Sequence, residues 1–242
     1  MSLNCTANLK TYQSGFSLIE LAVVLVIIGL LIGSFIGTLG SRIDNTRRMD
    51  TRDALQEIKT ALYGYVISQS PVRLPCPDTD NNGTENITAG SCTALTTHGN
   101  LPWVTLGIER GDAWASTYSY WAADVYSNTA GFDLTANAFG VARIDDSSGG
   151  NAISNTVAAV IYSHGKNQFG SIGLDNAARL AVPAGALYND ERENQDTDAA
   201  APVLFIDRAV TDTGATVVYD DILIWISEYE LKGKMVQAGA LP

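Results

Sequence analysis

The sequence predicts an α+β protein in which one long N-terminal helix precedes a strand-rich head domain. Two observations support this fold class. No proline interrupts residues 16–70, whereas the chain beyond about residue 100 alternates short β-branched or aromatic runs with Gly, Asn and Asp. We therefore expect a helix over residues 16–70 and a globular head over residues 71–242.

The first half of the expected helix is apolar all round. Between Glu20 and Arg42 lie 21 residues without a charged side chain. At about 1.5 Å of rise per residue, this run matches the roughly 30 Å hydrocarbon core of a bilayer. It predicts a transmembrane segment at about residues 20–41. A carboxylate at the edge of such a segment costs about 3 kcal/mol or more when it enters lipid, so Glu20 requires a specific role.

Residues 15–21 read Gly-Phe-Ser-Leu-Ile-Glu-Leu and lead directly into this apolar run. The motif resembles the cleavage and methylation signal of type IV pilins and of type II secretion pseudopilins. The resemblance implies that a prepilin peptidase removes a leader of residues 1–15, cutting between Gly15 and Phe16, and N-methylates Phe16. It also implies that Glu20 neutralises the amino terminus of a neighbouring subunit in a filament. An ordinary signal anchor, with Glu20 merely interfacial, is the alternative.

The same resemblance implies a pilin-like fold, in which the second half of the helix packs on an antiparallel β-sheet. It further implies a single-pass precursor in the bacterial inner membrane with a periplasmic head, and a cell-surface or periplasmic filament after assembly. The implied partners are other pilin subunits, the prepilin peptidase, an inner-membrane assembly platform and membrane lipid. The arginines that follow the apolar run would alone favour a cytoplasmic head, and here the resemblance takes precedence.

Three functions agree with these features. The size of the head favours a minor pilin of a type IV pilus. A type II secretion pseudopilin and a membrane-anchored adhesin that never polymerises are the alternatives. The formal net charge of −11 at pH 7 argues against a nucleic-acid partner, because phosphate binding needs clustered Lys and Arg.

The second half of the helix is amphipathic. Its apolar residues recur at spacings of three and four, which predicts one stripe packed on the head: Ala54, Leu55, Ile58, Ala61, Leu62, Tyr65 and Val66.

Two cysteines remain once the leader, which holds Cys5, is removed. A pair in a domain that faces an oxidising compartment favours a disulfide between Cys76 and Cys92. Two reduced, buried thiols are the alternative.

The loop after the helix carries oxygen side chains at alternate positions before a glycine. Asp78, Asp80, Asn82 and Glu85 resemble the first half of an EF-hand calcium loop, but Ala89 stands where a bidentate Glu belongs. A full EF-hand is therefore excluded. A partial calcium site and a simple polar turn are both consistent with these residue types.

Hydrophobic patterns predict the elements of the head. Strands are expected at residues 118–123, 157–163, 216–219 and 222–226, polar surface loops at 145–151 and 189–201, and a closing helix at 227–239. Ser227 and Glu230 form a capping-box pattern at the start of that helix.

We expect no enzymatic activity. The histidines, His98 and His164, belong to no zinc-binding spacing, and the sequence has no nucleophile elbow or phosphate loop. Residues 163–167 follow a predicted strand and are the best candidate for a catalytic site, although a strand-ending turn is favoured.

Overall fold

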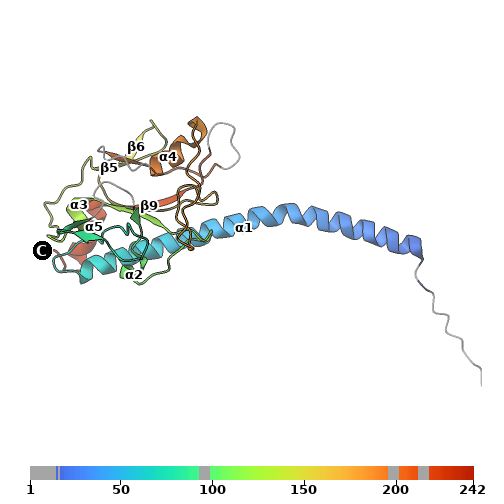
Figure 1. Cartoon of the computed structure of the whole chain (residues 1–242), viewed down its shortest axis with the longest axis horizontal. Coiled ribbons are helices and arrows are strands. Elements are labelled where there is room, and N and C mark those ends of the chain that lie inside the picture. Colours follow the sequence, from blue (N-terminus) through green and yellow to red (C-terminus); the bar gives the residue numbers. More distant parts are fainter. Residues whose placement is uncertain (1–14, 16, 93–98, 196–201, 212–217) are drawn as a thin grey trace, which may run out of the picture. The chain divides into compact units, whose positions relative to one another are not determined.

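The computed structural model describes residue 15 and residues 17–92, 99–195, 202–211 and 218–242, with the backbone alone at 34–39. The chain divides into two compact units, Met1–Asn45 and Thr46–Pro242. The first helix, α1 (Leu18–Ser68), contributes to both units and confirms the predicted long helix (Figure 1). It ends shortly before Pro71, which has no N–H to continue the hydrogen-bond ladder.

The described side chains at the start of α1 are exposed and mostly apolar. Leu18 is 91% exposed and Leu30 is 71% exposed, and the residues between them are also open to solvent. Within the part of the chain that the structure describes, no helix combines the length and apolarity needed to cross a membrane.

In the second unit, α1 lies on the head through the predicted apolar stripe. Leu55, Ile58, Leu62 and Val66 are at most 3% exposed and belong to the main core cluster. Their spacing of three and four residues places them on one helix face, as the sequence predicted.

The main sheet of the head is antiparallel and has the strand order β3-β4-β7-β9. Its strands are β3 (Gly99–Asn100), β4 (Ser119–Ala122), β7 (Val157–Ser163) and β9 (Ile222–Ser227). Every residue of β7 is buried, which agrees with its continuous apolar sequence and requires cover on both faces. The strands expected at 118–123, 157–163 and 222–226 are thereby confirmed.

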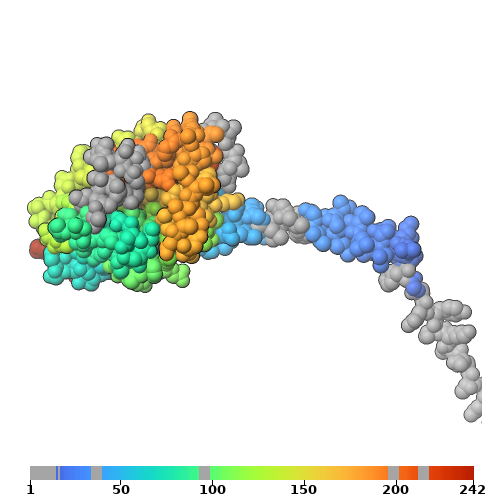
Figure 2. Space-filling model, in the orientation of Figure 1, coloured from blue at the N-terminus to red at the C-terminus, as the bar shows by residue number. Residues whose placement is uncertain are grey.

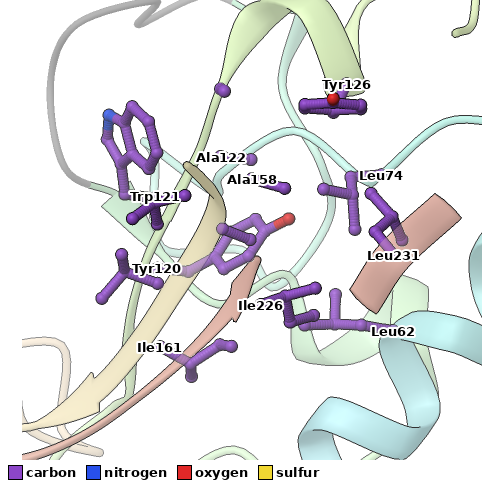
Figure 3. Packing of buried hydrophobic residues seen from close by; sticks show 14 of the residues in the cluster. Leu62, Leu74, Tyr120, Trp121, Ala122, Tyr126, Ala158, Ile161, Ile226 and Leu231 are labelled. Atoms are coloured by element: carbon purple, nitrogen blue, oxygen red, sulfur yellow. The ribbon is translucent and has the colours of Figure 1, made fainter. Parts of the chain in front are cut away.

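The two faces of this sheet have different neighbours. Leu62 of α1, Leu74 and Leu231 lie on the side to which Tyr120 points, whereas Trp121 lies on the other side (Figure 3). There the ring of Trp121 lies 5.8 Å from the ring of Phe205. Phe205 belongs to a second sheet of order β6-β5-β8, formed by β6 (Ala152–Ser154), β5 (Ala142–Asp145) and β8 (Val203–Ile206).

Short elements complete the described fold. They are β1 (Ile87–Thr88), β2 (Ser91–Cys92), α2 (Trp103–Leu106), α3 (Asp124–Ser127), the 3-10 turn η1 (Ala186–Tyr188), α4 (Asn189–Gln195) and α5 (Glu228–Gln237). The predicted closing helix is confirmed by α5, whose cap residue Ser227 accepts a hydrogen bond of 3.1 Å from the backbone N–H of Glu230.

Three predictions need correction or fall outside the description. A surface loop was expected at residues 189–201, but residues 189–195 form α4, and the remaining residues, 196–201, lie outside the described residues. Asn194 is fully buried, and its side-chain amide hydrogen-bonds to both backbone groups of Ile206. Only antiparallel pairing was expected, but in the second sheet β5 and β8 pair in parallel. Of the expected strand 216–219, the first two residues lie outside the described residues, and Tyr219 makes an isolated bridge to Thr211.

Candidate functional site

The helix start carries the predicted processing and assembly residues. Gly15 is exposed, and Phe16 lies outside the described residues. The Ser17 N–H donates to Glu20 Oε2 at 3.5 Å, and the Glu20 N–H donates to Ser17 Oγ at 3.2 Å. This reciprocal pair is a capping box, which satisfies two of the backbone donors left open at the start of α1. The Ser-x-x-Glu spacing of Ser17 and Glu20 is the sequence signal for this cap, which was not among the predictions.

Glu20 remains accessible in the single chain. Its side chain is exposed, and Ser17 is the hydrogen-bond partner that the structure gives its carboxylate. The helix surface that follows is apolar and is drawn in blue in Figure 2. An exposed apolar surface of this extent is rare on soluble proteins and marks a site of contact with lipid or protein.

A disulfide closes the loop that follows α1. Cys76 and Cys92 are joined with an S–S distance of 2.11 Å and a Cα–Cα distance of 5.2 Å, and both are buried. The predicted pairing is confirmed, since the alternative of two free thiols is not what the structure contains. The bond joins β2, which contains Cys92, to the segment that follows α1, which contains Cys76.

The loop enclosed by this disulfide brings Asp78, Asp80 and Asn82 into one turn. Asp78 Oδ2 accepts the Gly83 N–H at 2.7 Å, and Asp78 Oδ1 accepts the Asp80 N–H at 3.1 Å. Asp80 Oδ2 accepts a hydrogen bond of 2.8 Å from the Asn82 amide. Gly83 has φ of +83°, and a Cβ there would overlap the Trp103 ring. These contacts build the turn, and they leave the calcium hypothesis a prediction.

Glu85 is held by a different set of partners. Its two oxygens accept hydrogen bonds of 2.7 Å from both terminal nitrogens of Arg73, and Tyr65 donates to it at 2.7 Å. Burial alone would raise the pKa of Glu85, but the hydrogen bonds from Arg73 and Tyr65 outweigh it and keep the pKa below its ordinary value. Both oxygens of Glu85 are therefore bound by Arg73. No sequence pattern had linked these two residues.

The candidate catalytic residues after β7 lie inside the head. Ser163 Oγ donates to Asp112 Oδ2 at 2.5 Å, and His164 Nε2 shares a hydrogen bond of 2.8 Å with Ser119 Oγ. Ser163 is fully buried and His164 is 2% exposed. This burial favours the interpretation of a strand-ending turn. His98 lies outside the described residues.

Comparison with known proteins gives one match, which covers the start of the helix. Residues 10–36 match the family model described as the prokaryotic N-terminal methylation motif, which is the prepilin cleavage motif of type IV pilins and pseudopilins. The match contains Gly15, Phe16 and Glu20. No curated protein and no solved structure matches the chain.

Proposed function

We propose that this protein is a structural subunit of a type IV pilus or pilus-like filament, with the role of a minor pilin rather than of an enzyme. The observation that carries the proposal is the N-terminal methylation motif at residues 10–36. In this proposal a prepilin peptidase cuts after Gly15 and methylates Phe16. The precursor spans the inner membrane at about residues 20–41 and holds its head in the periplasm, where an oxidising environment allows the disulfide to persist.

Assembly then provides cover for two features of the helix start. Lipid covers the exposed apolar surface before assembly, and the helices of neighbouring subunits cover it afterwards. The carboxylate of Glu20 enters this low-dielectric core and is neutralised by the amino terminus of a neighbour. A buried charge needs such a partner, because an unpaired one costs several kcal/mol.

The turn of Asp78, Asp80 and Asn82 is proposed as a weak calcium site, without Glu85. Its support is the set of oxygen side chains, since hard cations prefer oxygen ligands. Calorimetric titration of calcium into an Asp80→Ala variant and into the unchanged chain tests this site. Equal heats of binding in the two proteins would rule it out.

The capping box allows a sharp test of the role of Glu20. Glu20→Gln keeps a side-chain acceptor for the Ser17 N–H but removes the charge, whereas Glu20→Ala removes both. The measurement is the fraction of the protein recovered in sheared filaments relative to membranes. We expect both variants to lose incorporation to a similar extent. Asp50→Ala, which removes an exposed acid from the same helix, is the control and should assemble normally.

Two outcomes contradict the proposal. Normal incorporation of Glu20→Gln would show that assembly does not need the charge of Glu20 and that its side chain only caps the helix. Normal incorporation of both variants would show that Glu20 has no role in assembly.

Deletion of the gene separates the pilus from the secretion alternative, because loss of surface filaments is expected for a pilin and loss of an exported protein for a pseudopilin.

A further inference from the structure

Three carboxylates meet inside the head, far along the sequence from the methylation motif. Glu191 lies on α4, and Asp220 and Asp221 lie directly before β9. They are 2%, 4% and 4% exposed. One oxygen from each lies within 4.8 Å of the oxygens of the other two. Of the three, only Glu191 falls in a segment that the sequence assigned, the loop expected at residues 189–201.

Neutral groups occupy half of the oxygens in this cluster. Glu191 Oε1 accepts from the Asn167 side-chain amide at 2.7 Å and from the Asp220 N–H at 3.1 Å. Asp220 Oδ2 accepts the Asn167 N–H at 2.9 Å. Asp221 Oδ2 accepts a hydrogen bond of 2.8 Å from the Asn194 side chain. Amide groups orient these carboxylates but do not cancel their charge.

Two buried oxygens in the cluster have no hydrogen-bond partner among the described residues. They are Glu191 Oε2 and Asp220 Oδ1. An orphaned carboxylate oxygen in the interior forfeits the hydration it had in water, at a cost of a few kcal/mol. Native structures rarely retain such atoms without an ion or a water to satisfy them. These oxygens are therefore an independent sign of a ligand.

We propose that Glu191, Asp220 and Asp221 bind one calcium ion, which ties α4 to the start of β9. All three donors are oxygens, the ligand type that calcium selects. Two ligands at about 2.3–2.6 Å from an ion lie at most about 5.2 Å apart, and the observed spacing of up to 4.8 Å lies within this limit. Asp221 also lines a cavity of about 210 Å³ beside Asp207 and Arg208.

The test uses the full chain in detergent, stripped of metal with a chelator and then titrated with calcium chloride. We expect calcium to raise the thermal unfolding midpoint and to bind with a dissociation constant on the order of 10⁻⁴–10⁻³ M or tighter, as in extracellular calcium sites. In the double variant Glu191→Gln, Asp220→Asn, binding should weaken at least tenfold. That variant keeps the side-chain shapes and removes the buried repulsion, so we expect it to fold.

The matched control is the double variant Asp80→Ala, Asn82→Ala, which alters the other candidate calcium loop. It should retain the shift in unfolding midpoint. Terbium chloride gives a second readout on the unchanged chain, because Tyr219, which hydrogen-bonds with Asn194 at 3.3 Å, lies close enough to sensitise its luminescence. Calcium should displace this signal.

Three results would overturn the proposal. They are the absence of any midpoint shift at 5 mM calcium, unchanged calcium affinity in the Glu191→Gln, Asp220→Asn variant, and loss of the shift in the control instead. A larger shift with magnesium than with calcium would overturn the choice of ion. None of these results depends on whether the chain assembles into filaments.

Discussion

Arg73 forms a bidentate ion pair with Glu85, which lies in the loop enclosed by the disulfide, with two N–O distances of 2.7 Å. Only 10% of the Arg73 side chain and 15% of the Glu85 side chain are exposed. Tyr65 of α1 donates to the same carboxylate, and so does the backbone N–H of Cys76 at 3.0 Å. One carboxylate thus connects the long helix, the loop that follows it and the disulfide.

Replacing Arg73 by Ala should lower the free energy of unfolding by about 3–5 kcal/mol, because Glu85 would remain buried without its cation. Urea unfolding of the full chain in detergent measures the change. Arg179→Ala is the control, since Arg179 and Asp175 form a more exposed pair at 3.2 Å, with 30% and 59% of the side chains exposed. That pair should contribute at most about 1 kcal/mol. Equal losses in the two variants would refute the special role of Arg73.

Replacing Leu62 by Ala tests the packing of α1 on the head. Leu62 is fully buried in the main core, so the substitution should lower the free energy of unfolding by about 2–5 kcal/mol. Ile67 lies on the same helix but is 46% exposed. Ile67→Ala should therefore change stability by about 0.5 kcal/mol or less. A small effect at both positions would show that the stripe does not anchor the helix.

The double substitution Cys76→Ser, Cys92→Ser should lower the free energy of unfolding by about 3 kcal/mol. The bond spans a sequence separation of 16, and the chain-entropy model gives about this value for a loop of that length. Reduction of the unchanged chain should produce a similar loss. If the reductant leaves the unfolding midpoint unchanged, the bond is either absent or without effect on stability.

Asp112 predicts a dependence of stability on pH. Burial raises the pKa of Asp112 above its ordinary 3.8, although hydrogen bonds from Ser163, Ser116 and Trp114 oppose the shift. The native state therefore binds the proton more tightly than the unfolded state. As pH rises from about 3.8 through the native pKa, this group lowers the free energy of unfolding, and the loss is complete above that pKa.

The variant Asp112→Asn removes this titration. Urea unfolding between pH 4 and pH 8 should show the unchanged chain losing stability relative to Asp112→Asn as pH rises. The difference between the two proteins isolates Asp112, because the other titrating groups are common to both. Parallel pH profiles would contradict the prediction.

Local patterns were sufficient to predict some elements. The α1 stripe follows from apolar spacing, β7 from seven consecutive residues that can all be buried, and α5 from its cap at Ser227. Each of these signals lies within a few residues of the element it specifies. The capping box of Ser17 and Glu20 belongs to the same class and was overlooked.

Other features depend on partners distant in the sequence, and periodicity carries no information about them. Helix α4 has a polar sequence typical of a loop, but Asn194 is buried by its bonds to Ile206 of β8. The parallel pairing of β5 with β8 joins strands that a long segment separates. The carboxylate cluster unites Glu191 with Asp220, and neither residue alone indicated a site.

The mass of the intact protein extracted from membranes tests the central claim most directly. Our account predicts a chain that begins at Phe16, carries one added methyl group and lacks two hydrogens because of the Cys76–Cys92 bond. A mass equal to that of all 242 residues without the methyl group would contradict it. The chain would then be a tethered protein that no prepilin peptidase has processed.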